Sequence, residues 1–145
     1  MIVYLDASAL VKRYVAETGS GEVDTLIASA SATGTAVISR VEVSSAFAKA
    51  ARMRLLSREE AASALQVFNS EWESLIRLQM TEVLISRAAT LAWEHGLRGY
   101  DAVHLAAALF WQDMLGDPVT LASYDRQLWE AAKTSGLIAW PGSLP

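Results

Sequence analysis

Four acidic residues of this chain occupy similar positions relative to its apolar segments. Asp6, Glu42 and Asp125 each follow a short apolar run within one to four residues, and each stands where a helical pattern begins. Asp101 also opens a helical pattern, although a turn precedes it instead of an apolar run. Each acid alone has a structural explanation, because carboxylates cap helices and are favoured in the first helical turn. A single shared site would account for all four at once.

Carboxylates that meet in one site need a compensating positive charge. Two of them about 4 Å apart repel by roughly 4 kcal/mol at an effective dielectric constant near 20, so they must take up protons or hold a cation. The chain has no cysteine, and its two histidines, His95 and His104, are not spaced as a zinc pair. Hard oxygen ligands of this kind suit Mg²⁺ or Mn²⁺. A carboxylate-held ion that keeps several waters is suited to the hydrolysis of phosphodiester bonds.

Five short apolar runs predict the strands that would position these acids. The runs are Ile2–Leu5, Thr35–Ile38, Leu75–Leu78, Val119–Ala122 and Leu137–Trp140. Segments with helical spacing of apolar residues lie between them, and this alternation predicts an α/β fold in which helices cover both faces of a parallel sheet. Because the carboxyl ends of parallel strands share one edge of the sheet, we expect the four acids to converge there.

Two of the predicted helices begin with Ser-x-x-Glu, the sequence of a capping box. Ser39 would pair with Glu42, and Ser57 would pair with Glu60. In that role Glu42 would cap its helix and would not bind a metal ion. The helix that contains His104 is apolar nearly all round, which predicts a buried element. There we expect His104 to be packed or hydrogen-bonded, not catalytic.

Length and composition favour one domain spanning residues 1–145. The chain has no basic leader, no run of about 18 apolar residues and no cysteine, so we expect a cytoplasmic protein with no membrane partner. Its net charge of −4 argues against attraction of polyanions over long range, so any contact with nucleic acid must be local or assisted by cations. The hydrophobic fraction of 52% suggests a surface covered by a partner or by a second copy.

Four segments in this order resemble the motifs of PIN-domain ribonucleases, and most closely those of the VapC-type toxins of VapBC toxin–antitoxin pairs. The segments are Asp6-x-Ser8, Glu42 at a helix start, Tyr100-Asp101-Ala102-Val103-His104-Leu105-Ala106, and Ser123-x-Asp125-x-x-Leu128. Each is short, but the ordered set covers essentially the whole chain. The resemblance implies a PIN-like three-layer α/β/α sandwich with a short five-stranded parallel sheet.

The same resemblance implies an activity and the residues that perform it. The activity is Mg²⁺- or Mn²⁺-dependent cleavage of RNA, held silent by a cognate antitoxin, and we expect the protein to be a homodimer. Asp6, Glu42, Asp101 and Asp125 would be the catalytic and metal-binding acids, although the family also accepts Asn at the position of Asp125. Ser8 and Ser123 would orient carboxylates and water through their hydroxyls. Ser123 replaces the commoner Thr and keeps that hydroxyl.

The sequence leaves two other functions open. An aspartyl-phosphate phosphatase also places an Asp after its first strand, but it needs a second Asp two residues later, where this chain has Ser8. A non-catalytic α/β module that binds a partner could keep its acids only as helix caps.

Basic residues offer several candidate contacts for RNA phosphates. The basic run Lys49, Arg52, Arg54 and Arg58 is better explained as a solvated helix end than as a phosphate track. Other cations lie near the predicted site in sequence, and the sequence does not choose among them: Lys12, Arg13, Arg98 and Arg126.

Overall fold

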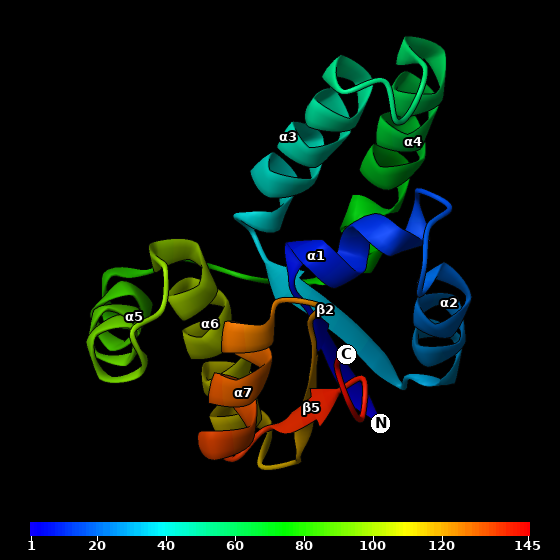
Figure 1. Cartoon of the computed structure of the whole chain (residues 1–145). Coiled ribbons are helices and arrows are strands. Elements are labelled where there is room, and N and C mark those ends of the chain that lie inside the picture. The colour runs from blue at the N-terminus through cyan, green and yellow to red at the C-terminus, as the bar shows by residue number, and fades with distance from the viewer.

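A five-stranded sheet lies between two layers of helices in the computed structural model, which describes residues 1–145 (Figure 1). The strands are β1 (Ile2–Leu5), β2 (Ala32–Ala36), β3 (Ile76–Leu78), β4 (Val119–Ala122) and β5 (Ile138–Trp140). The helices are α1 (Ala7–Leu10), α2 (Ser20–Ser29), α3 (Ser39–Arg52), α4 (Arg58–Glu71), α5 (Glu82–His95), α6 (Gly99–Leu115) and α7 (Arg126–Thr134), with short 3-10 turns η1 (Val11–Arg13) and η2 (Trp72–Ser74). The expected α/β/α sandwich is confirmed.

The strand order β3-β2-β1-β4-β5 places β1 in the middle of the sheet. Ile2 is in register with Ala32 of β2 on one side and with Val119 of β4 on the other. All four strand pairings are parallel, so the carboxyl ends of the strands meet at one edge. The segments that follow β1, β2 and β4 therefore begin next to one another.

The second strand differs from its prediction, because it covers Ala32–Ala36 and not residues 35–38. Its start, Ala32-Thr33-Gly34, has no apolar run, and pairing with β1 and β3 makes it a strand. A Cβ added at Gly34 would lie 2.9 Å from the Trp111 ring of α6, so only glycine allows β2 to approach the helix this closely. At the other end, Ile38 has helical backbone angles and ends the extended segment.

Side chains alternate along β1 and so divide the core into two parts. Val3 and Leu5 face a cluster of 13 buried residues that includes side chains of α1, α2, α3 and α4. Tyr4 faces a cluster of 20 buried residues formed mostly by α5, α6 and α7. The predicted burial of the helix around His104 is confirmed, since α6 runs along the sheet within this second cluster.

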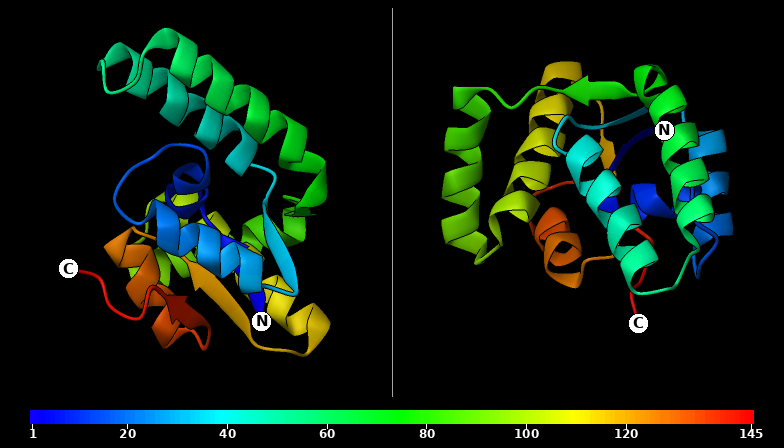
Figure 2. Two further views of the ribbon diagram at one scale, coloured as in Figure 1. Left: turned by 90° about the vertical axis from the view of Figure 1, so that its right-hand side faces the viewer. Right: turned by 90° about the horizontal axis from the view of Figure 1, so that it is seen from above.

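Helices α3 and α4 form a hairpin that projects beyond the sheet (Figure 2). At the start of α4 the predicted capping box of Ser57 and Glu60 is present. The basic run lies around the tip of this hairpin, where Lys49, Arg52, Arg54 and Arg58 are all exposed. No helix of the structure is both long enough and apolar enough to span a membrane.

Candidate active site

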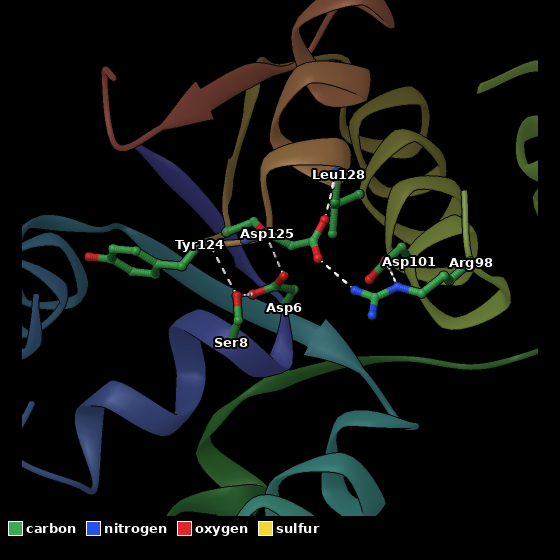
Figure 3. Close-up of polar contacts among 8 residues, drawn as sticks. Asp6, Ser8, Arg98, Asp101, Tyr124, Asp125 and Leu128 are labelled. Carbon is green, nitrogen blue, oxygen red and sulfur yellow. Dashed lines mark hydrogen bonds and ion pairs between the residues drawn. The ribbon is translucent and has the colours of Figure 1, made fainter. Parts of the chain in front are cut away.

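The predicted acids lie around the carboxyl edge of the sheet. Asp6 directly follows β1, Asp125 comes just before α7, and Asp101 and Glu42 occupy the first turns of α6 and α3. Asp6, Asp101 and Asp125 lie close to one another, with Ser8 beside Asp6 (Figure 3). The fold therefore brings together three acids from separate parts of the chain.

Asp6 is held rigidly at the base of this site. Its side chain accepts hydrogen bonds at Oδ1 from Ser8 Oγ (2.7 Å) and the Ala9 amide (2.9 Å), and at Oδ2 from Ser123 Oγ (2.6 Å). The bond to Ala9 makes Asp6 the N-cap of α1, so the structural role suggested by the sequence is also present. Asp6 is only 3% exposed, and three donors fix its carboxylate.

The two serines tie neighbouring turns of the chain together. Ser8 Oγ accepts a hydrogen bond from the Tyr124 amide at 2.9 Å, while Ser123 Oγ accepts one from the Asp125 amide at 3.0 Å. Each hydroxyl thus donates to Asp6 and accepts from the segment that leads to α7 (Figure 3). Both serines thus hold Asp6 through hydrogen bonds.

Asp125 uses its two carboxylate oxygens for different contacts. Oδ1 accepts from the Leu128 amide at 3.1 Å and caps α7, while Oδ2 accepts from Nη2 of Arg98 at 2.6 Å. The same guanidinium reaches Oδ2 of Asp101 through Nε at 3.1 Å. Arg98 therefore bridges two of the predicted acids, although its own side chain is 73% exposed.

Among the cations near the site in sequence, only Arg98 contacts the predicted acids. Lys12 binds Glu17 and the Thr18 carbonyl oxygen. The other two are also engaged elsewhere: Arg13 with Asp24 and Glu71, and Arg126 with the Leu144 carbonyl oxygen.

Glu42 does not form the predicted capping box. Helix α3 has no side-chain cap, and the Ser39 hydroxyl is hydrogen-bonded to Thr35 Oγ1 at 2.6 Å inside the protein. Glu42 Oε1 instead lies 2.6 Å from Nε2 of His104. The prediction that His104 is hydrogen-bonded is confirmed, but its partner across 62 residues had no signal in the sequence.

Burial and crowding of negative charge raise the pKa of two of these acids. Burial raises the pKa of Asp6, against the nearby His104 ring and the hydroxyls that stabilise the carboxylate. Burial and the adjacent Asp125 carboxylate raise the pKa of Asp101, although Arg98 opposes this. Such shifts mark a place where positive charge is favoured.

The chemistry of these side chains fits a divalent cation, but their present arrangement does not yet form a metal site. No group of three acidic or histidine side chains is close enough to hold a metal ion. The chain's own donors hold the carboxylates, and the Arg98 guanidinium is the positive group between Asp101 and Asp125. An all-oxygen donor set with excess negative charge matches the preference of Mg²⁺ and Mn²⁺.

An apolar cavity of about 570 Å³ opens beside the acids. Glu42 and Asp101 lie at its polar side, together with Arg98. Its remaining lining comes mainly from apolar side chains of α5, α6 and the segments before them, including Met80, Ile85, Ala88, Ala92 and Val103.

The protein is a parallel α/β/α sandwich with acids at the carboxyl edge of its sheet, and comparison with known proteins gives the family. Residues 3–133 match the model of the PIN domain. Ribonuclease VapC45 of Mycobacterium tuberculosis is 37% identical over 144 residues, which cover 99% of this chain and 97% of that protein. The chain belongs to the PIN-domain family, as the resemblance of its motifs indicated.

Solved structures agree on the fold. PAE2754 of Pyrobaculum aerophilum superposes with a TM-score of 0.67 at 23% identity, covering 96% of this chain and 89% of that one. A toxin–antitoxin complex from Klebsiella pneumoniae contains a chain with a TM-score of 0.61 at 15% identity, covering 85% of this chain and 86% of that one. At these identities the likeness concerns the architecture.

Proposed function

We propose that this protein is an endoribonuclease that hydrolyses RNA phosphodiester bonds with the help of Mg²⁺ or Mn²⁺. The observation that carries the proposal is that Arg98 bridges two acids of different elements beside a third, buried acid, Asp6. A site that holds a cation between carboxylates in this way can hold a divalent ion there. The ribonuclease VapC45, which is similar over 99% of this chain, supports RNA as the substrate.

The residues would divide the work as follows. Asp6 supplies a carboxylate of fixed orientation, because three hydrogen-bond donors hold it. Asp101, Asp125 and Glu42 would complete the oxygen ligands from three further elements. The bound ion would neutralise charge on the phosphate and make a water molecule more acidic. Ser8 and Ser123 would keep the Asp6 carboxylate in its orientation through their hydrogen bonds.

RNA cleavage by the purified chain, free of any partner, tests this proposal. We expect cleavage of single-stranded RNA with Mg²⁺ or Mn²⁺, none in excess EDTA, and none by Asp6→Asn although it folds. Asp113→Asn is the matched control, because Asp113 is an exposed acid of α6 whose partner is Arg87, outside the site. Equal cleavage with and without EDTA would refute the metal dependence.

The structure argues against an aspartyl-phosphate phosphatase. The residue two positions after Asp6, Ser8, donates to Asp6 itself and does not reach outward as a general acid. A non-catalytic module that uses its acids only as caps would show neither metal binding nor RNA cleavage in the experiment above.

We also propose that a small antitoxin protein neutralises the enzyme. A chain of similar fold occurs in the toxin–antitoxin complex from Klebsiella pneumoniae. The apolar cavity beside Asp101 would accept apolar side chains of the antitoxin, and a basic side chain would reach the acids and compete with the metal ion. The position of Arg98 demonstrates that a guanidinium fits between Asp101 and Asp125.

We propose in addition that the enzyme is a homodimer. Several large apolar side chains of α5 and α6 are exposed, among them Val83 (73%), Trp93 (90%) and Met114 (62%). Exposed apolar area of this kind favours association with a second copy.

A further inference from the structure

Tyr4 and His104 form a hydrogen-bonded chain that ends on Glu42. Tyr4 is fully buried in the middle strand, and His104 is 1% exposed on α6. The Tyr4 hydroxyl lies 2.6 Å from Nδ1 of His104, and Nε2 of the same ring lies 2.6 Å from Oε1 of Glu42. The two rings pack edge to face with centroids 5.8 Å apart. The sequence separations are 100 and 62 residues, so the fold alone creates this arrangement.

One hydrogen bond at the Tyr4 hydroxyl has a direction that the backbone fixes. The Ala36 amide donates to the Tyr4 hydroxyl oxygen at 3.1 Å. In the proposed arrangement the Tyr4 hydroxyl donates its proton to Nδ1 of His104, and Nδ1 itself carries no proton. The ring proton is consequently on Nε2, which donates to Glu42. The Ala36 amide of β2 thus favours the Nε2–H tautomer of a histidine whose Nε2 contacts Glu42.

This contact is the only side-chain hydrogen bond that holds Glu42. The capping box that would otherwise have fixed its carboxylate does not form. One carboxylate oxygen, Oε1, is bound by His104, and no hydrogen bond from the protein reaches Oε2. A carboxylate held at one oxygen by a buried donor is fixed in orientation and keeps its other oxygen for a ligand.

We infer that His104, held by Tyr4 in its Nε2–H form, is a positioning residue that aims the Glu42 carboxylate at the bound cation. The inference rests on the proposed function, since it gives Glu42 its orientation within that site. His104 touches neither substrate nor reacting atoms. Its effect is to remove the rotational freedom that Glu42 would otherwise lose when the ion binds.

Heteronuclear NMR of the imidazole nitrogens in metal-free protein tests the first step. The protein has only two histidines, so His95, which does not contact Tyr4 or Glu42, serves as an internal reference. We expect His104 in the Nε2–H form in the wild type, and a loss of that single form in Tyr4→Phe. A protonated Nδ1 in the wild type would overturn the inference.

Calorimetric Mn²⁺ binding, measured well below the unfolding temperature of each variant, tests the second step. We expect His104→Ala to weaken binding by about tenfold or more, the usual effect of removing a partner that orients a metal ligand. His104→Gln should recover part of the affinity, because its amide N–H can replace Nε2–H. If His104→Ala lowers the unfolding temperature but binds Mn²⁺ like the wild type, the role is structural and the inference is wrong.

If His104→Ala does not fold, Mn²⁺ binding by Tyr4→Phe provides a second test of the inference. We expect this substitution to weaken Mn²⁺ binding severalfold, whereas Tyr14→Phe should leave binding unchanged. Tyr14 is a matched control, because its ring packs on Phe47 and Phe68 away from the acids. Failure of the wild type to bind Mn²⁺ would refute the proposed function itself. Normal Mn²⁺ binding by both the wild type and Tyr4→Phe would refute only the positioning role of His104.

Discussion

Arg98 and Asp125 are 27 residues apart in the sequence, and Nη2 of Arg98 lies 2.6 Å from Oδ2 of Asp125. The same guanidinium also binds Asp101, so one exposed cation pairs with two acids of the site. A divalent ion held by these acids needs the oxygens that Arg98 now occupies. Arg98 would therefore compete with such an ion.

Replacement of Arg98 should strengthen metal binding. We expect Arg98→Gln to raise Mn²⁺ affinity by up to about fivefold, the free energy of one exposed ion pair. Arg87→Gln is the control, because it removes a similar exposed pair with Asp113 away from the acids and should leave the affinity unchanged. Titration calorimetry measures the Mn²⁺ affinities of the wild type, Arg98→Gln and Arg87→Gln. Unchanged affinity in Arg98→Gln would mean that Arg98 does not compete with the ion.

Glu42→Gln separates charge from hydrogen bonding at one position. The Gln amide oxygen can still accept the proton on Nε2 of His104, so metal-free stability should stay within about 0.5 kcal/mol of the wild type or rise as repulsion is relieved. The stabilisation by Mn²⁺ and the cleavage of RNA should fall sharply, because Gln supplies no negative charge. Thermal unfolding with and without Mn²⁺ measures both effects. A Gln variant that cuts RNA and gains stability from metal like its parent would remove Glu42 from the site.

The raised pKa of Asp101 gives metal-free stability a definite dependence on pH. A carboxyl whose pKa is higher in the folded state binds more protons there, so its contribution is present below the ordinary pKa and is lost as pH rises through the raised value. Asp101→Asn has no carboxyl at this position, so its stability lacks this decrease with rising pH. We expect the stability of the variant relative to the wild type, from urea unfolding in EDTA, to increase between about pH 4 and about pH 7. A difference that does not change with pH would contradict the assignment.

Self-association should depend on the exposed side of α5. Light scattering should give the mass of a dimer for the wild type, and a charge placed on the surface by Trp93→Glu should favour the monomer. Leu55→Glu is a comparable change at the hairpin between α3 and α4, where Leu55 is 74% exposed, and it should leave the dimer intact. A monomeric wild type would contradict the proposal. Dissociation by Leu55→Glu alone would place the interface on the hairpin.

The sequence by itself determined every strand except β2, the burial of α6 and the positions of the acids along the chain. Strands β1 and β4 have the predicted bounds, and β3 and β5 differ by one residue at their start. These features follow from local chemistry, because a run of apolar residues ends where the chain leaves the core. An acid at that point is visible in the sequence, and parallel pairing makes it face the same edge as the others.

Only the tertiary structure decided which groups hold those acids. Ser39-x-x-Glu42 has the same local pattern as Ser57-x-x-Glu60, yet only the second forms a capping box. Ser39 is drawn to Thr35 in the interior, and Glu42 to His104. Partners separated by 62 residues, or by 27 for Arg98 and Asp125, meet because of the strand order and the packing of α6. Hydrophobic periodicity records which face of an element is buried, but not which polar side chains of other elements will meet it there.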